Sequence, residues 1–203
     1  LRKLDFLVVQ DIFLTETARL ADVVLPGVSF AEKLGTISNT ERRVQLSNPA
    51  LTPRGNVRQD YEIIADLATR FGHTFPRTPA GLFQEIRDLT PSYAGITYDR
   101  IRDVGIQWPC PTTEHPGTRF LHAGKFARGL ALLTPIAYKP PAEEPDGKYD
   151  LVLSTGRIYE HFHTGSMTRR SSILDAVVRT GHVEIHPELA SKHGISTGDQ
   201  VAV

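Results

Sequence analysis

The chain has 203 residues, of which 40% are hydrophobic and 23% charged, an ordinary composition for a globular protein. Its 23 basic and 23 acidic residues cancel, so no overall field favours nucleic acid or an anionic membrane. The single cysteine, Cys110, excludes an intrachain disulfide framework and any multi-cysteine zinc or iron–sulfur site within these residues. No apolar run approaches the ~20 residues of a membrane-spanning helix, so direct membrane insertion is not expected.

The first predicted elements form a strand–helix–strand unit. Residues 4–11, LDFLVVQD, are an apolar run closed by polar residues, which is typical of a buried strand in a parallel sheet. Thr15 is a candidate N-cap of a short helix, and residues 22–27, DVVLPG, predict a second buried strand. This order indicates an open α/β sheet, which binds ligands at the carboxyl ends of its strands, where Gln10 and Asp11 lie.

The next segment, residues 30–55, is polar and turn-rich and contains the basic pair Arg42 and Arg43. Residues 59–73, QDYEIIADLATRFGH, then predict an amphipathic helix that ends at Gly72. Its apolar face is expected to contain Ile63, Ile64, Leu67, Ala68 and Phe71. A first domain, residues 1–75, is predicted to end just after this helix.

Residues 76–147 are predicted to be a proline-rich connecting segment that lies across a surface. Eleven of the chain's fourteen prolines fall between Pro53 and Pro145, and little periodicity follows a short helix predicted over residues 80–89.

Residues 148–203 form the last predicted domain. A strand over 149–153 leads into a loop, RIYEHFHTGSMTRRSS, that is rich in hydroxyl and basic side chains. A helical stretch, ILDAVVR, follows the loop. Strands are then predicted at 182–185 and after Gly198, on either side of a helix that starts after Pro187 and stops at Gly194.

Several interpretations of the loop histidines stay open. His161 and His163 alternate with Phe162, so on a strand both would face one side and could chelate a metal, although no carboxylate or cysteine supports this. They could also be ordinary polar loop residues. The hydroxyls, the glycine, the backbone amides of HTGSMT and Arg157 together suit a pyrophosphate. Nucleic-acid binding is disfavoured, because the basic residues form no continuous stripe.

Three other polar positions have ordinary structural interpretations, and Asp11 also has a functional one. Asp11 is either an Asx-type cap of the following turn or an acceptor for a ribose hydroxyl or a guanine edge. Lys33 taken alone is typical of a solvated lysine, and Asp60 is typical of a helix N-cap.

The order of these stretches along the whole chain resembles the molybdopterin oxidoreductase superfamily. The resemblance rests on VVQD and the following residues, on Gly-x-x-Arg-x-Asp at 55–60, on STGRIYEHFHTGSMTRRS and on VEIHPELASKHGISTGDQV. GTISNTERRVQ and residues 93–122 are most similar to the catalytic alpha subunit of formate dehydrogenases, whereas nitrate reductases share mainly the HTGSMTRR loop. ARGLALLTPIAY lacks two basic residues of the family pattern.

The resemblance implies a Rossmann-like open parallel sheet followed by the first part of a double-psi β-barrel. It also implies a molybdenum or tungsten ion held by two molybdopterin guanine dinucleotides. Gln10, Asp11, Lys33 and Asp60 would contact the guanosine portion of one dinucleotide. The other would be bound by Thr155, Gly156, Arg157, His161, His163, Thr164, Gly165, Ser166, Met167 and Thr168.

The family's metal-ligating cysteine or selenocysteine, substrate arginine and iron–sulfur cysteines have no match in this sequence. We therefore expect the chain to be a C-terminal fragment that is inactive alone, from a protein that oxidises formate to carbon dioxide. A nitrate reductase or a cofactor-free structural relative in a respiratory complex are the alternatives. The expected partners are the rest of the polypeptide and iron–sulfur electron-transfer subunits. A cytoplasmic location is expected, with a periplasmic one open because any export signal would precede residue 1.

Overall fold

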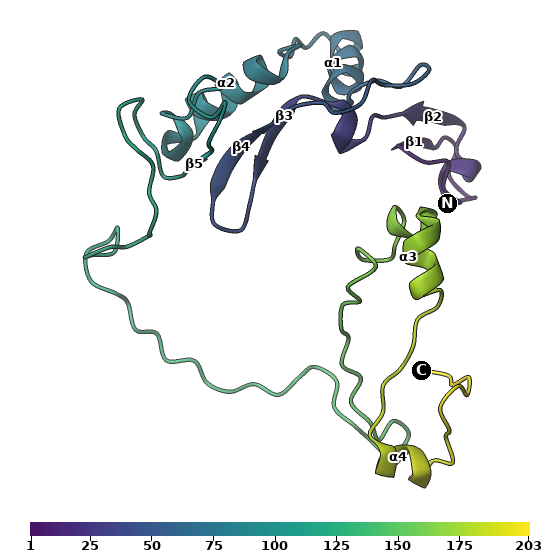
Figure 1. The fold of residues 1–203 in the computed structure, drawn as a ribbon. Coiled ribbons are helices and arrows are strands. Elements are labelled where there is room, and N and C mark those ends of the chain that lie inside the picture. Colours follow the sequence, from purple (N-terminus) through teal and green to yellow (C-terminus); the bar gives the residue numbers. More distant parts are fainter. The chain divides into compact units, whose positions relative to one another are not determined.

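The computed structural model describes residues 1–203 as two compact units, Leu1–Leu133 and Thr134–Val203. Both units combine short helices with much irregular chain, and the sheets of the first unit are small (Figure 1). The mixed α/β class is therefore confirmed at this coarse level. None of the helices combines the length and the apolar composition needed to cross a membrane.

The first sheet of unit 1 pairs β1 (Val8–Asp11) with β2 (Val23–Pro26) in parallel. The connection is a 3-10 helix, η1 (Ala18–Leu20), and Thr15 Oγ1 accepts a hydrogen bond from the Ala18 N–H at 3.2 Å. The predicted strand–helix–strand order is confirmed. The N-cap is Thr17 and not Thr15, although the Thr15 side chain does bond to the first residue of the helix. The prediction that these strands are buried is wrong, since Val8 is 45% exposed. A sheet of two strands has too few neighbours to cover both of its faces.

A second, antiparallel sheet follows the 3-10 helix η2 (Phe30–Glu32), in a segment predicted only as polar and turn-rich. β3 (Gly35–Ser38) pairs with β4 (Arg43–Ser47), which also pairs with β5 (Ile106–Gln107). Asn39 closes the turn, accepting from the Arg42 N–H through its carbonyl and from the Arg43 N–H through its side chain. The hairpin is hard to predict because its strands are short and largely polar.

The helix α1 (Asp60–Arg70) is confirmed, with Gly72 in the left-handed region at φ +80° just after its end. The N-cap is Gln59, so the N-cap prediction for Asp60 is wrong by one residue, and Asp60 lies in the first turn instead. Ile63 of the predicted apolar face is buried, but Phe71 is 78% exposed. The face therefore packs against the rest of unit 1 only in part.

The main hydrophobic core is formed largely by residues after 76, although that region was expected to be a surface connection. It contains Val44, Phe83, Ile96, Ile101, Ile106 and Cys110. Phe83 comes from α2 (Pro79–Leu89), which is followed by the 3-10 helix η3 (Pro91–Tyr93). Arginine side chains stabilise the irregular segments by hydrogen bonds to backbone carbonyls. Arg100 donates to the carbonyl of His115 at 2.7 Å, and Arg42 donates to that of Thr118 at 3.0 Å.

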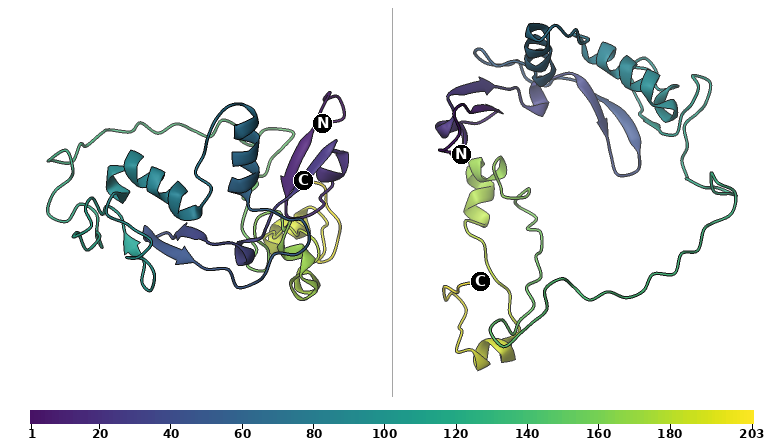
Figure 2. Two further views of the ribbon diagram at one scale, coloured as in Figure 1. Left: turned by 90° about the horizontal axis from the view of Figure 1, so that it is seen from above. Right: turned by 180° about the vertical axis from the view of Figure 1, so that it is seen from behind.

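Unit 2 contains the 3-10 helix η4 (Thr168–Arg170), α3 (Ser172–Val177) and α4 (Pro187–Lys192). An extended segment joins α3 to α4 (Figure 2). Both predicted helices are confirmed, as is the stop at Gly194, which has φ +65°. The strands predicted at 149–153, at 182–185 and after Gly198 are wrong, because these extended segments have no partner with which to form a hydrogen-bonded ladder.

Candidate functional site

Three of the predicted site residues of unit 1 meet at one carboxylate, that of Asp60. Gln10 Nε2, at the end of β1, donates to Asp60 Oδ1 at 2.6 Å. Lys33 Nζ, just after η2, donates to Asp60 Oδ2 at 2.9 Å. We call Gln10, Lys33 and Asp60 the Asp60 cluster. It brings together residues up to 50 positions apart in the sequence, at the carboxyl end of β1, as expected for an open α/β sheet.

Gly27 allows the start of α1 to approach the sheet. The chain before α1 bonds to the end of β2, because the Arg58 N–H donates to the Pro26 carbonyl at 3.1 Å and the Val28 N–H to the Arg58 carbonyl at 3.2 Å. Gly27 is buried, and a Cβ atom there would lie 3.2 Å from Asp60 Oδ1. The sequence places Gly27 only at the end of the second predicted strand, although a glycine at a strand end also permits close approach.

Asp11 does not join the Asp60 cluster through any side-chain contact. Its Oδ1 accepts from the Phe13 N–H at 2.9 Å, which is the Asx-type turn that was one of its two interpretations. Its carbonyl accepts from the Gly27 N–H at 3.2 Å. Asp11 therefore shapes the turn after β1, and its contact with a ligand stays a prediction.

The Asp60 carboxyl is held in its charged form. Burial raises its pKa, but hydrogen bonds from Lys33 and Gln10 and the charge of Lys33 lower the pKa more, so that the net value falls below the ordinary 3.8. A charged carboxylate only accepts hydrogen bonds, and its two oxygens suit the paired N–H groups of a guanine edge or a ribose hydroxyl. The carboxylate is 45% exposed and so accessible to a ligand.

The lowered pKa predicts a pH dependence of stability. A carboxyl with a depressed folded-state pKa adds stability that is present above its unfolded value and lost as the pH falls through the lower folded value. The difference in unfolding free energy between the wild type and Asp60→Asn should therefore shrink as the pH falls below about 3.8. Urea denaturation of both proteins at a series of pH values measures it, and a constant difference across this window would contradict the assignment.

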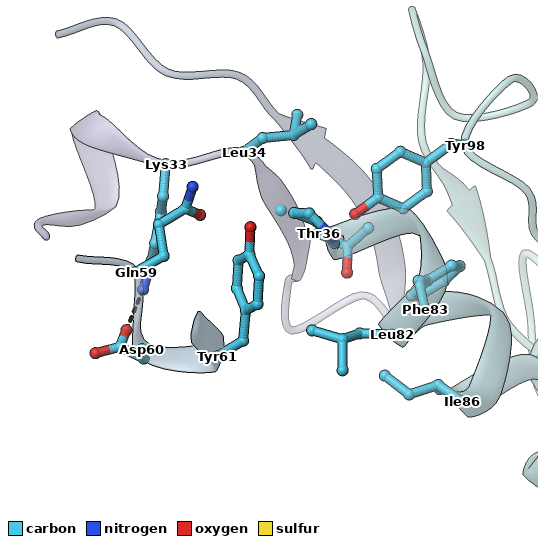
Figure 3. Close-up of a pocket in the computed structure, with 12 residues that line it drawn as sticks. Lys33, Leu34, Thr36, Gln59, Asp60, Tyr61, Leu82, Phe83, Ile86 and Tyr98 are labelled. Atoms are coloured by element: carbon cyan, nitrogen blue, oxygen red, sulfur yellow. Dashed lines mark hydrogen bonds and ion pairs between the residues drawn. The ribbon is translucent and has the colours of Figure 1, made fainter. Parts of the chain in front are cut away.

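A pocket of about 260 Å³ lies beside the Asp60 cluster (Figure 3). Lys33 and Asp60 line one end and Tyr98 the other, while the walls are mostly apolar side chains from α1, α2 and the chain around β3, including Leu34, Tyr61, Leu82, Phe83 and Ile86. Burial raises the pKa of the Tyr61 and Tyr98 hydroxyls, so both stay neutral. Sequence reasoning missed this pocket because its walls come from segments far apart in the chain.

The loop of unit 2 places its two histidines differently. His161 is 6% exposed, and its ring nitrogens lie 3.0 Å from Thr168 Oγ1 and 2.6 Å from the Val178 carbonyl. His163 is exposed, with its ring against that of Phe162 at 4.4 Å between centroids. The two rings would face one side only on a strand, and this segment is not a strand, since the backbone of His163 is left-handed at φ +53°.

The same loop presents hydrogen-bond donors that the chain does not use. The backbone N–H groups of Thr164, Ser166 and Met167 make no hydrogen bond within the chain, and all three residues are exposed. His163 and Gly165 have positive φ, a backbone conformation that recurs in anion-binding turns. Thr155, Gly156 and Arg157 are exposed in the extended segment before the loop.

Residues 1–70 match the family model for molybdopterin oxidoreductases, and residues 151–203 match that for the molybdopterin dinucleotide binding domain. The two matches together cover more than half of the chain. The alpha subunit of F420-dependent formate dehydrogenase 1 from Methanococcus maripaludis is 49% identical over 100% of the chain. The chain belongs to the molybdopterin oxidoreductase family. The family expected from the sequence motifs is thereby confirmed.

Other family members are also similar along the chain. The F420-dependent formate dehydrogenase alpha subunit of Methanocaldococcus jannaschii is 48% identical over 100% of the chain, and the assimilatory nitrate reductase catalytic subunit of Bacillus subtilis is 40% identical over 100%. The chain spans 31% and 30% of their lengths, and 31% of the Methanococcus maripaludis subunit.

The solved structure of acetylene hydratase from Pelobacter acetylenicus superposes with a TM-score of 0.66 at 22% sequence identity. The match covers 96% of this chain and 29% of the hydratase. At this identity the likeness shows the fold alone.

No group of three or more His, Cys, Asp or Glu side chains in residues 1–203 is placed to hold a metal ion.

Proposed function

We propose that the chain is the C-terminal, cofactor-binding part of a formate dehydrogenase catalytic subunit. The whole protein would oxidise formate to carbon dioxide, one proton and two electrons. The observation that carries this proposal is the 48–49% identity to formate dehydrogenase alpha subunits along the entire chain, against 40% for the nitrate reductase. A nitrate reductase is the second candidate because that similarity also runs the full length.

The proposed cofactor is a molybdenum or tungsten ion carried by two molybdopterin guanine dinucleotides. When bound, it would supply the redox-active metal centre, while this chain binds and orients it. The Asp60 cluster would take the guanosine portion of one dinucleotide, since it offers an accessible carboxylate beside a cationic lysine. The loop of residues 162–168 would take the pyrophosphate of the other, since its open N–H groups and hydroxyls are donors.

Further contacts belong to the same proposal. In fold terms, unit 1 would contain part of a Rossmann-like domain, and residues 148–203 would begin a double-psi β-barrel. Exposed residues of unit 2 that would add contacts to the second dinucleotide are Thr155, Gly156, Arg157, His163, Thr164, Ser166 and Met167. Asp11 would contribute to the first dinucleotide from the turn after β1.

The partners in this proposal are the rest of the same polypeptide and iron–sulfur electron-transfer subunits in the cytoplasm. Two relatives are named as F420-dependent formate dehydrogenases, so F420 is the proposed electron acceptor downstream of the iron–sulfur clusters.

Steady-state assays of the full-length polypeptide would separate the two candidate activities. The protein is incubated either with formate and an oxidised viologen dye or with nitrate and the reduced dye. The proposal predicts formate-dependent dye reduction and no nitrate-dependent dye oxidation, and the reverse pattern would assign the chain to a nitrate reductase. The 203-residue chain alone is expected to be inactive in both assays and serves as the control.

A further inference from the structure

The side chains of the loop divide into those that face inward and those that face outward. His161 faces inward, where both of its ring nitrogens have partners within the chain. The Val178 carbonyl can only accept a hydrogen bond, so His161 Nε2 carries the hydrogen. Thr168 Oγ1 accepts from the Phe162 N–H at 3.3 Å, and its own hydrogen is then directed to His161 Nδ1. His161 Nε2 therefore donates toward residue 178, and Nδ1 faces the Thr168 hydroxyl.

Arg169 makes a second inward connection between the same two segments. Its Nη1 donates to the Arg179 carbonyl at 2.8 Å and also approaches the Val178 carbonyl and Asp175 Oδ1, each at 3.4 Å. The stem of Arg169 packs on Gly165, where a Cβ atom would lie 2.7 Å from Arg169 Cγ. His161 and Arg169 thus attach both ends of the loop to residues 178–179.

We propose that His161 is a positioning residue that acts through Thr168. We use the term relay for the chain of hydrogen bonds that runs from the Phe162 N–H through Thr168 and His161 to the Val178 carbonyl. The relay fixes the backbone of the loop. It thereby sets the positions of the open N–H donors of Thr164, Ser166 and Met167. The Thr168 hydroxyl then serves the loop and not the ligand, unlike the expectation that His161 and Thr168 touch the dinucleotide directly. This inference rests on the proposed function in one respect, which is that the ligand of the open N–H groups is taken to be the dinucleotide.

The test compares variants of the full-length protein for the rate at which they lose bound guanine nucleotide. Thr168→Val keeps the shape of the side chain but removes the hydroxyl of the relay, so we expect loss to be about tenfold faster, the usual effect of one missing hydrogen bond. Thr168→Ser keeps the hydroxyl and should restore slow loss. Thr180→Val is the matched control, because Thr180 is exposed and its side chain makes no hydrogen bond in the structure.

A double-mutant cycle distinguishes a relay from two independent ligand contacts. His161→Phe and Thr168→Val break the same relay, so the double variant should lose nucleotide no more than about tenfold faster than the wild type. Direct contacts would instead add, giving about a hundredfold effect. Additive effects, or an unchanged Thr168→Val, would overturn the inference. A wild type that holds no guanine nucleotide would instead overturn the proposed function.

Hydrogen exchange at the imidazole C2 carbon, followed by mass spectrometry, tests the loop without relying on a ligand. His161 should exchange more slowly than exposed His163 in the same loop, and Thr168→Val should abolish the difference. Equal exchange of the two histidines in the wild type would contradict the inward placement.

Discussion

Asp60→Asn is expected to release one of the two proposed dinucleotides from the full-length protein. The asparagine keeps the size of the side chain but replaces one acceptor oxygen by an amide that donates hydrogen bonds. That amide would face Lys33 and Gln10, which are themselves donors, and would offer a guanine edge only one acceptor. Hydrogen bonds to a charged group contribute ~1.5–3 kcal/mol, so affinity should fall about ten- to a hundredfold. Guanine nucleotide released by denaturation, per chain, measures the effect.

The matched control for this variant is Asp66→Asn, on the same helix. Asp66 pairs with Arg58 at 2.7 Å and with Arg77 at 2.6 Å, so its replacement removes two ionic contacts, one more than the replacement of Asp60. These pairs are exposed at the surface and are not part of the Asp60 cluster, so nucleotide content should be unchanged. Loss of nucleotide from both variants would show a general effect on stability, and loss from neither would remove Asp60 from the site.

Gly165→Ala is expected to impair binding of the other dinucleotide. Gly165 has φ +79°, which L side chains rarely adopt, and its added Cβ would meet the stem of Arg169 at 2.7 Å. Strain of this kind costs ~1–3 kcal/mol, and relief by movement of the loop would displace the open donors of Thr164 and Ser166. We expect a loss of guanine nucleotide together with faster amide exchange of residues 161–169.

Gly181→Ala provides the control for the loop. Gly181 lies in the same unit, has no positive φ and has nothing within 4 Å of its would-be Cβ, so an alanine should fit without strain. Full nucleotide content in Gly165→Ala would show that the loop shape does not matter for binding.

Local patterns predicted the helices well. The helix over residues 60–70 follows from apolar spacing and a glycine stop, and the helix at Pro187 follows from a proline in the first turn. The core could not be predicted, because it joins Val44 to Ile96 and Cys110, which are far apart in the sequence and lie in short or irregular segments. The strands predicted for unit 2 failed for a related reason, since a strand depends on partners that its own sequence does not reveal.

The residue types of the candidate site could be predicted from the sequence, but most of the contacts between those residues could not. Gln10 and Asp60 could be singled out as polar residues beside a strand end and a helix start. Their contact with Lys33 depends on tertiary packing, as does the close approach that Gly27 permits. In the loop, residue types indicated a pyrophosphate site. They could not indicate that His161 and Thr168 face inward, because that depends on the left-handed backbone at His163 and on the distant Val178 carbonyl.

The most direct test of the central claim is the stoichiometry of cofactor in the full-length native protein. The protein is purified from cells able to make the cofactor and denatured, and molybdenum, tungsten and guanine nucleotide are quantified per chain. Our account predicts about one metal ion with two guanosine equivalents per chain. A folded protein with neither metal nor nucleotide would contradict it and would identify the chain as a structural relative that has kept the fold without the cofactor.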